Sequence, residues 1–189
     1  HRAGGRLHKA PMEKGQPQTE ANRQRYRFLV DHLPAGLLVH AADTRVVLSN
    51  PKASALLGLS PEQMLGKPAT DPSWQFLRED GSPLPIEEYP AQQVFATGRA
   101  VSNQLVGIRR QTTGDLIWML AHAYPDLDAQ SQVRQTVVML IDISRRKQTE
   151  AALQASETRY RELYRSAQRQ ALEAALLDQV RTVVADELD

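Results

Sequence analysis

The chain has 189 residues, with 23 lysines and arginines against 22 aspartates and glutamates, 41% hydrophobic residues and no cysteine. This length suits one domain with extensions, and the missing cysteines exclude disulfides, thiolate metal sites, cysteine nucleophiles and photochemistry through a cysteine adduct. No apolar run is long enough to span a membrane, and the chain shows no signal peptide. We therefore expect a cytoplasmic segment of a longer protein.

The first part of the chain changes composition near Thr19. Residues 1–18 are rich in glycine, proline and charged groups and almost free of apolar side chains, which predicts a disordered linker. Apolar residues at helical spacing then predict a leading helix over residues 19–33, which Pro34 ends.

A hairpin and two short helices are predicted next. The apolar segments 36–40 and 46–48 flank a polar turn, as in an antiparallel hairpin. Asn50 and Ser60 each precede a proline, and Gly58 and Gly66 follow about two turns later, a pattern that predicts two capped helices. Helices this short are stable only when packed, so we expect them to cover a sheet.

The middle of the chain predicts an irregular segment, one helix and three strands. Residues 67–86 contain four prolines and should be irregular, and a third helix is predicted over residues 87–97. Strands are predicted over residues 101–109, 116–124 and 133–143. This order of elements predicts an α+β fold, with a five-stranded antiparallel sheet and short helices on one face.

The remainder of the chain predicts one long helix, because no glycine or proline occurs from Arg145 to Asp189. Apolar side chains follow alternating three- and four-residue steps, as in a coiled-coil seam: Tyr160, Leu163, Ala167, Ala174, Leu177 and Val184. A second stripe fits a register shift or the early start of another domain: Leu172, Leu176, Val180 and Val183. A helix that folds back on its own sheet is the alternative.

Four stretches of the sequence occur in a characteristic order: Arg25-Tyr-Arg-Phe-Leu29 with Leu33-Pro-Ala-Gly36, Leu48-Ser-Asn-Pro51 with Leu56-Leu-Gly58, Gly114-Asp-Leu-Ile-Trp118, and Asp142-Ile-Ser-Arg-Arg-Lys147. Together they resemble the PAS domain, the sensory module of bacterial histidine kinases, diguanylate cyclases and related regulators. The resemblance implies a sensory domain over residues 34–144 and an output helix over 145–189, leading to a downstream domain. Residues 176–181 resemble the run-in to a GAF domain.

The resemblance also implies a small-molecule pocket between the sheet and the helices. We predict that Trp118, with Leu120 and Met139, faces the helices, and that Trp74 and Phe95 line the opposite wall. The predicted pocket residues are Leu38, His40, Asn50, Trp74, Phe95, Trp118, Leu120 and Met139.

Three of these residues have simpler interpretations. Asn50 is well placed to cap the helix that follows it. Trp118 on an antiparallel strand also suits plain core or a dimer surface. His40, on a strand, is a candidate for a structural histidine with satisfied hydrogen bonds.

Cofactors of known PAS relatives are not favoured. The oxygen-sensing haem relatives use a histidine on the long helix before the third strand, and the predicted helix over residues 87–97 has none. Flavin-binding relatives stack aromatic residues around the isoalloxazine ring, but we do not expect flavin here. We expect no metal, and either no ligand or an unidentified small molecule.

Asp142 and Arg146 are the predicted signal-relay pair. The resemblance implies that the aspartate at the end of the last strand pairs with a basic residue in the outgoing helix. An exposed ion pair contributes only about 0–1 kcal/mol to stability. Such a pair is therefore better suited to a conformational switch than to stabilising the fold. A helix-start aspartate beside a solvated arginine is the alternative.

Catalytic motifs are missing from the sequence. No histidine is followed by an acidic residue, and there is neither a Gly-Gly-Asp/Glu-Glu-Phe loop nor a glycine-rich phosphate loop. The arginines after Ser144 alternate with glutamates, as on a solvated helix face, so nucleic-acid binding is not expected. We therefore expect a sensory fragment that is not an enzyme.

The expected function is a sensory and dimerisation module that passes a cue through its C-terminal helix to an effector in the same chain, most naturally in a sensor histidine kinase. The alternatives are the input domain of a diguanylate cyclase, a ligand-free dimerisation module and a flavin-type redox sensor. The expected partner is a second copy, bound through the helices, the sheet or both, without insertion into a membrane.

Overall fold

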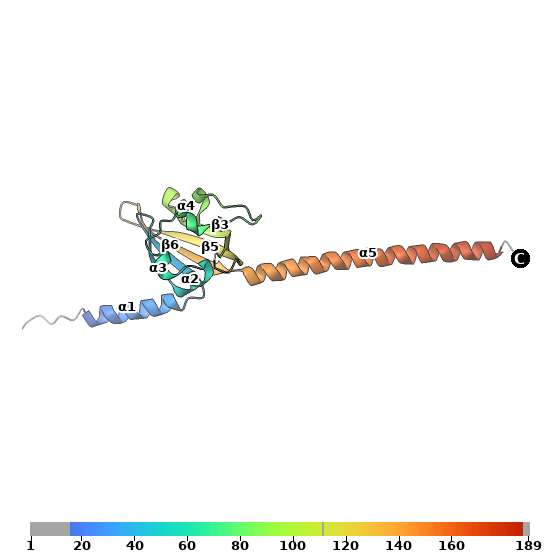
Figure 1. Ribbon diagram of the computed structural model, residues 1–189, viewed down its shortest axis with the longest axis horizontal. Coiled ribbons are helices and arrows are strands. Elements are labelled where there is room, and N and C mark those ends of the chain that lie inside the picture. Colours follow the sequence, from blue (N-terminus) through green and yellow to red (C-terminus); the bar gives the residue numbers. More distant parts are fainter. Residues whose placement is uncertain (1–15, 111, 187–189) are drawn as a thin grey trace, which may run out of the picture. The chain divides into compact units, whose positions relative to one another are not determined.

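The computed structural model describes residues 16–110 and 112–186, which fall into two units that meet after Asp142. The first unit contains a six-stranded antiparallel sheet with short helices (Figure 1), and the second is the helix α5 (Ser144–Asp186). The strand order is β2-β1-β6-β5-β4-β3, so that the first and last strands of the domain are neighbours inside the sheet. The predicted α+β fold is confirmed.

The strands follow the predicted segments closely, with one addition. A two-residue strand, β3, forms within the segment predicted to be irregular and pairs with Gly107 and Ile108. It makes the sheet six-stranded instead of five-stranded. The strands are β1 (Gly36–Ala41), β2 (Val46–Ser49), β3 (Phe76–Leu77), β4 (Val101–Arg109), β5 (Leu116–Leu127) and β6 (Val133–Asp142).

The helices differ from the prediction mainly at their first residues. The leading helix begins at Gln16, three residues before the predicted start, so the linker predicted over residues 1–18 is wrong for residues 16–18. Its remaining residues, 1–15, lie outside the described residues. Pro90 is the first residue of α4, because proline is accepted at the first helical position, and the preceding acidic residues form a 3-10 turn. The helical segments of the domain are α1 (Gln16–Asp31), α2 (Pro51–Leu57), α3 (Pro61–Met64), η1 (Pro72–Trp74), η2 (Ile86–Glu88) and α4 (Pro90–Thr97).

The side chain of Asn50 joins three segments of the domain. Its Oδ1 accepts hydrogen bonds from the backbone N–H of Ala53, at 2.9 Å, and of Leu37, at 2.8 Å. Its Nδ2 donates to the carbonyl oxygens of Val30, at 3.0 Å, and Ala35, at 2.9 Å. Asn50 therefore caps α2, as the Asn-Pro pair predicts, and also fixes the end of α1 and the start of β1.

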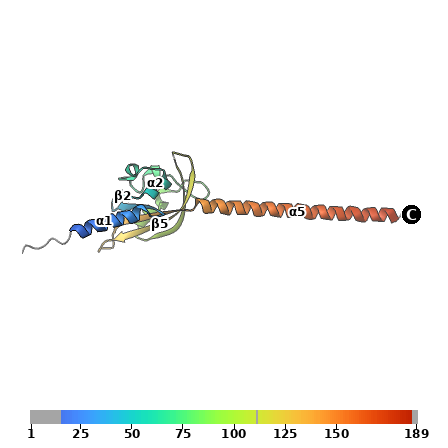
Figure 2. The same cartoon turned by 90° about the horizontal axis from the view of Figure 1, so that it is seen from below.

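The two faces of the sheet carry different side chains. Met119, Ala121 and Ala123 of β5 and Val138 and Leu140 of β6 point to the core and are buried against the helices. Residues of α2 and α4 belong to the same core, and Figure 2 shows α2 on one side of the sheet. The alanines leave room for α4, which packs on β5 and β6.

The outer face carries the large side chains that were predicted to face the helices. Trp118, Leu120 and Met139 alternate with the buried residues and are partly exposed, so the predicted orientation of Trp118 is wrong. The physical reason is a close fit on the outer face: a Cβ added to Gly107 would lie 2.9 Å from the Trp118 ring. The tryptophan thus packs across the strand on a glycine instead of entering the core.

We predict that Asn50→Ala lowers the free energy of unfolding by roughly 2–4 kcal/mol, because it removes a cap and leaves buried backbone groups without partners. Urea denaturation monitored by circular dichroism measures this loss. Ser60→Ala is the matched control, since Ser60 caps the exposed helix α3 and its loss should cost only about 1 kcal/mol. Equal losses in the two variants would contradict the role of Asn50 as a tertiary link.

We predict that Met119→Ala destabilises the domain more than Trp118→Ala, although tryptophan is the larger residue. Met119 is fully buried, so its truncation should leave a cavity at a cost of about 2–5 kcal/mol. Trp118 keeps part of its surface in water, and its truncation should cost roughly 1–2 kcal/mol. Thermal unfolding of both variants provides the comparison, and a larger loss for Trp118→Ala would place the tryptophan in the core.

Candidate functional site

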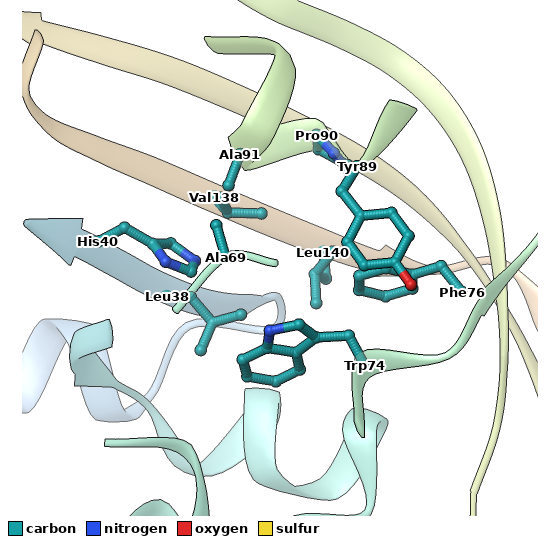
Figure 3. A pocket seen from close by; sticks show the side chains of 10 residues that line it. All are labelled: Leu38, His40, Ala69, Trp74, Phe76, Tyr89, Pro90, Ala91, Val138 and Leu140. Atoms are coloured by element: carbon teal, nitrogen blue, oxygen red, sulfur yellow. The ribbon is translucent and has the colours of Figure 1, made fainter. Parts of the chain in front are cut away.

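The candidate site is a small pocket between the core face of the sheet and the segment over residues 67–91. Its cavity volume is about 20 Å³, which is enough for about one water molecule. Figure 3 shows His40 at one end, Phe76 and Tyr89 at the other, and Trp74 along one side. The lining residues are Leu38, His40, Ala69, Trp74, Phe76, Tyr89, Pro90, Ala91, Val138 and Leu140.

The two walls of the pocket differ in construction. Leu38 and His40 on β1 and Val138 and Leu140 on β6 form one wall, and these strands are joined by a continuous antiparallel ladder. The other wall comes from a turn, a 3-10 helix, the two-residue strand β3 and the first residues of α4. The sheet wall is therefore held by one continuous ladder of backbone hydrogen bonds, and the opposite wall by separate bonds of turns, short helices and a two-residue strand pairing.

Aromatic packing closes the end of the pocket away from His40. Phe76 and Tyr89 contact each other edge to face, with ring centroids 5.0 Å apart. The Trp74 Nε1–H donates to the carbonyl oxygen of Pro68 at 2.9 Å, which fixes the orientation of the indole. Burial raises the pKa of the Tyr89 hydroxyl, so this group stays neutral at neutral pH.

His40 is the buried histidine of this site, with 3% of its surface exposed. Its Nδ1 lies 2.8 Å from the carbonyl oxygen of Thr44, in the turn after β1. Burial lowers the pKa of His40 below its ordinary value, and the hydrogen bond to Thr44 opposes this shift only in part. The ring is therefore neutral at neutral pH.

The predicted pocket residues separate into three groups. Leu38, His40 and Trp74 line the pocket, and Phe95 packs beside it, with its ring centroid 6.5 Å from that of His40. Asn50 is fully buried but makes its four hydrogen bonds to backbone groups outside the pocket. The remaining predicted residues lie on the other face of the sheet: Trp118, Leu120 and Met139.

Sequence reasoning missed seven lining residues. Two of them, Val138 and Leu140, follow from strand alternation once the faces of the sheet are assigned correctly. The others come from the proline-rich segment and the start of α4, where no periodicity indicates which side chains turn inward: Ala69, Phe76, Tyr89, Pro90 and Ala91.

Comparison with known proteins identifies the fold. A family model described as PAS fold matches residues 30–148, which is more than half of the chain. The chain belongs to the PAS family. No curated protein sequence matches it.

Solved structures of PAS domains resemble this one at low sequence identity. An RNA-binding light-oxygen-voltage receptor matches 80% of this chain with 20% identity and a TM-score of 0.56, and the chain spans 41% of that receptor. The PAS domain of an HTR-like protein from Haloarcula marismortui matches 67% of this chain and 95% of its own length, with 17% identity and a TM-score of 0.51. A light-oxygen-voltage protein from Rhodobacter sphaeroides matches 73% of this chain and 76% of its own length, with 17% identity and a TM-score of 0.50. These likenesses support the PAS fold alone.

The residues predicted to relay the signal lie at the end of the PAS domain. Asp142 is the last residue of β6, and Arg146 is in the first turn of α5. The Arg146 Nε lies 2.9 Å from Oε1 of Glu150, one turn along the same helix. Pairing between Asp142 and Arg146 stays a prediction.

No helix within residues 16–110 and 112–186 is long and apolar enough to cross a membrane. The same part of the chain holds no group of three or more histidine, aspartate or glutamate side chains suited to a metal ion. The expectations about haem and flavin stay predictions.

We predict that His40 makes the stability of the PAS domain pH-dependent. Because its folded-state pKa lies below its ordinary value of 6.5, the unfolded chain binds a proton that the folded chain does not. Stability from this group is complete above about pH 7 and falls as the pH drops through 6.5 towards the lower folded-state value. Thermal unfolding between about pH 7.5 and pH 5 should therefore show a loss in the wild type that is smaller in His40→Leu.

The matched control is Thr136→Val, which alters the buried cross-strand neighbour of His40 on β6 without removing a titratable group. This variant should keep the pH dependence of the wild type. An unchanged pH dependence in His40→Leu would show that other groups are responsible.

Proposed function

We propose that this PAS domain is a sensory and dimerisation module that passes a cue through α5 to an effector domain in the same chain. The observation that carries the proposal is the 43-residue helix α5, which follows the last strand and has large apolar side chains in water. Isolated helices gain little stability from propensity alone, and an apolar stripe along them is normally covered by a partner.

The apolar positions of α5 support a parallel pair of helices. Leu153, Tyr160, Ala167 and Ala174 recur every seven residues, the period that keeps one seam facing a partner helix. Tyr160 is 71% exposed, and the seam position Leu163 is 64% exposed. A second copy of the chain would remove these side chains from water.

The last strand connects the pocket with this helix in the sequence. Val138 and Leu140 on β6 line the pocket, Asp142 ends the strand, and α5 begins at Ser144. A molecule that moves these two side chains would act on the strand that leads into α5. This short connection in the sequence supports a relay in which the junction between β6 and α5 changes between two alternative arrangements.

Arg146 is the residue that we propose to switch partners at this junction. It is exposed and pairs with Glu150 one turn away, an interaction worth only about 0.3–0.5 kcal/mol in helices. Exchange of Glu150 for Asp142 would therefore change the free energy little in either direction. Because the two arrangements would have nearly equal free energies, a ligand with a small difference in affinity for them would shift the equilibrium between them.

A sensor histidine kinase is the host that we propose, on the resemblance of the exit motif and the helix after it to that class; the input position of a diguanylate cyclase is the alternative. We also propose that the domain works in the cytoplasm and does not bind nucleic acid. The small cavity favours a second candidate function, a dimerisation module that carries no ligand at all.

Two copies of the chain could also contact each other through the outer face of the sheet. The outer face carries apolar side chains at directly paired positions of β6, β5 and β4, with His122 among them. Tyr124 and Ile141 are the most exposed of its large apolar side chains, at 43% and 37%. This surface is the second place where two copies could meet.

We predict that the chain is a dimer and that Leu163→Lys with Leu177→Lys weakens it at least tenfold, because two charges would lie in the apolar seam. Sedimentation velocity over a range of concentrations measures the dissociation constant. Thr158→Lys with Gln168→Lys is the matched control, because it adds the same charge to exposed positions of α5 outside the seam. Tyr124→Lys reports on the sheet surface in the same experiment.

A monomeric wild type would contradict the proposed output through α5. A dimer that resists the seam variant and dissociates with Tyr124→Lys would place the contact on the sheet.

A further inference from the structure

The pocket in Figure 3 contains one unengaged hydrogen-bond acceptor. The Trp74 N–H is bound to Pro68, and the Tyr89 hydroxyl is hydrogen-bonded to the backbone of Phe76. A carbonyl oxygen only accepts, so the Nδ1 of His40 must carry the proton that it donates to Thr44. In the neutral ring Nε2 is then an acceptor, and none of the described residues is hydrogen-bonded to it.

A buried hydroxyl without a partner lies beside this histidine, on a residue that is not among those that line the pocket. Thr136 on β6 is the direct cross-strand partner of His40, so that both side chains stand on the core face, where paired Cβ atoms are about 4.5–5.5 Å apart. The Thr136 side chain is fully buried, and its Oγ1 has no hydrogen-bond partner among the described residues. A buried hydroxyl in this state costs stability, which a ligand or a water molecule would restore.

The rest of the pocket is apolar and uncharged. No lysine, arginine, aspartate or glutamate lines it, so an ionised ligand would lose its hydration without gaining a counter-charge. Three aromatic side chains form much of the surface opposite the sheet: Trp74, Phe76 and Tyr89. These walls favour a flat apolar molecule.

We propose that the pocket binds a small, neutral aromatic alcohol whose hydroxyl donates to Nε2 of His40. A hydroxyl suits this position because, besides its donor, it carries two acceptor positions, which the neighbouring Oγ1 of Thr136 could use once the pocket has opened. The proposal rests on the sensory function proposed above and names the chemical class of the cue.

Binding requires the pocket to open. Its volume of about 20 Å³ is well below the roughly 150 Å³ of an apolar cavity that holds benzene. The wall over residues 67–90 is the part that can yield, because β3 pairs with β4 through only two residues. The ladder between β1 and β6, which carries His40 and Thr136, stays in place.

Phenol and toluene test the proposal, because they differ by a hydroxyl in place of a methyl group. Titrations of the ¹⁵N-labelled chain should give chemical-shift changes in residues 67–90 and around His40 with both compounds. The ratio of phenol affinity to toluene affinity should fall roughly tenfold in His40→Leu, the equivalent of one hydrogen bond, and by a smaller factor in Thr136→Val. Thr136→Val removes an unsatisfied hydroxyl at nearly constant shape, so this variant should fold.

The matched control is His122→Leu, in which the affinity ratio should equal that of the wild type. A readout without substitution is the Nε2 resonance of His40 in a long-range ¹H–¹⁵N spectrum, which phenol should shift much further than toluene does, because only phenol donates a hydrogen bond to it.

The proposal is overturned if phenol does not bind, if its shifts map to the outer face of the sheet, or if both pocket variants keep the wild-type affinity ratio. The phenol titration and the sedimentation experiment are independent, so a pocket without phenol in a stable α5 dimer would refute the ligand class alone. A monomer that binds phenol would refute the proposed output alone.

Discussion

Asn50 holds together the parts of the domain on which the pocket and the leading helix depend. One buried amide uses both its acceptor and its donors, and its partners are the end of α1, the entry to β1 and the first turn of α2. A buried backbone group that is left without a partner costs about 1–3 kcal/mol. This single side chain therefore ties the entry of β1, the strand that carries His40 and Leu38, to the end of α1 and the start of α2.

The parts of the fold that could be predicted from sequence are those governed by local rules. The Asn-Pro and Ser-Pro pairs fix two helix starts, and alternating residues fix the strands. Strand alternation does not say which face is inner, and the size of Trp118 pointed to the wrong one. The decisive facts are long-range: Gly107 lies across from Trp118, and Ala121 and Ala123 give α4 room to approach.

The same limit explains which residues of the candidate site could be predicted from the sequence. Leu38, His40 and Trp74 could be selected because they sit in apolar or aromatic contexts near predicted helices. Phe76 and Tyr89 could not, because a segment with irregular backbone gives no period from which to assign side-chain direction. The unsatisfied Oγ1 of Thr136 is visible only after β1 and β6 are placed in register.

The edges of the sheet bear on how the chain meets other molecules. At one edge β2 has four residues, and at the other β3 has two. Beyond β3, the open part of β4 is interrupted by a bulge at Ser102 and Asn103, where Asn103 has a φ of 56°. Short and bulged edges are poor templates for strand addition, so the sheet resists growth into fibrils and leaves association to its outer face and to the helices.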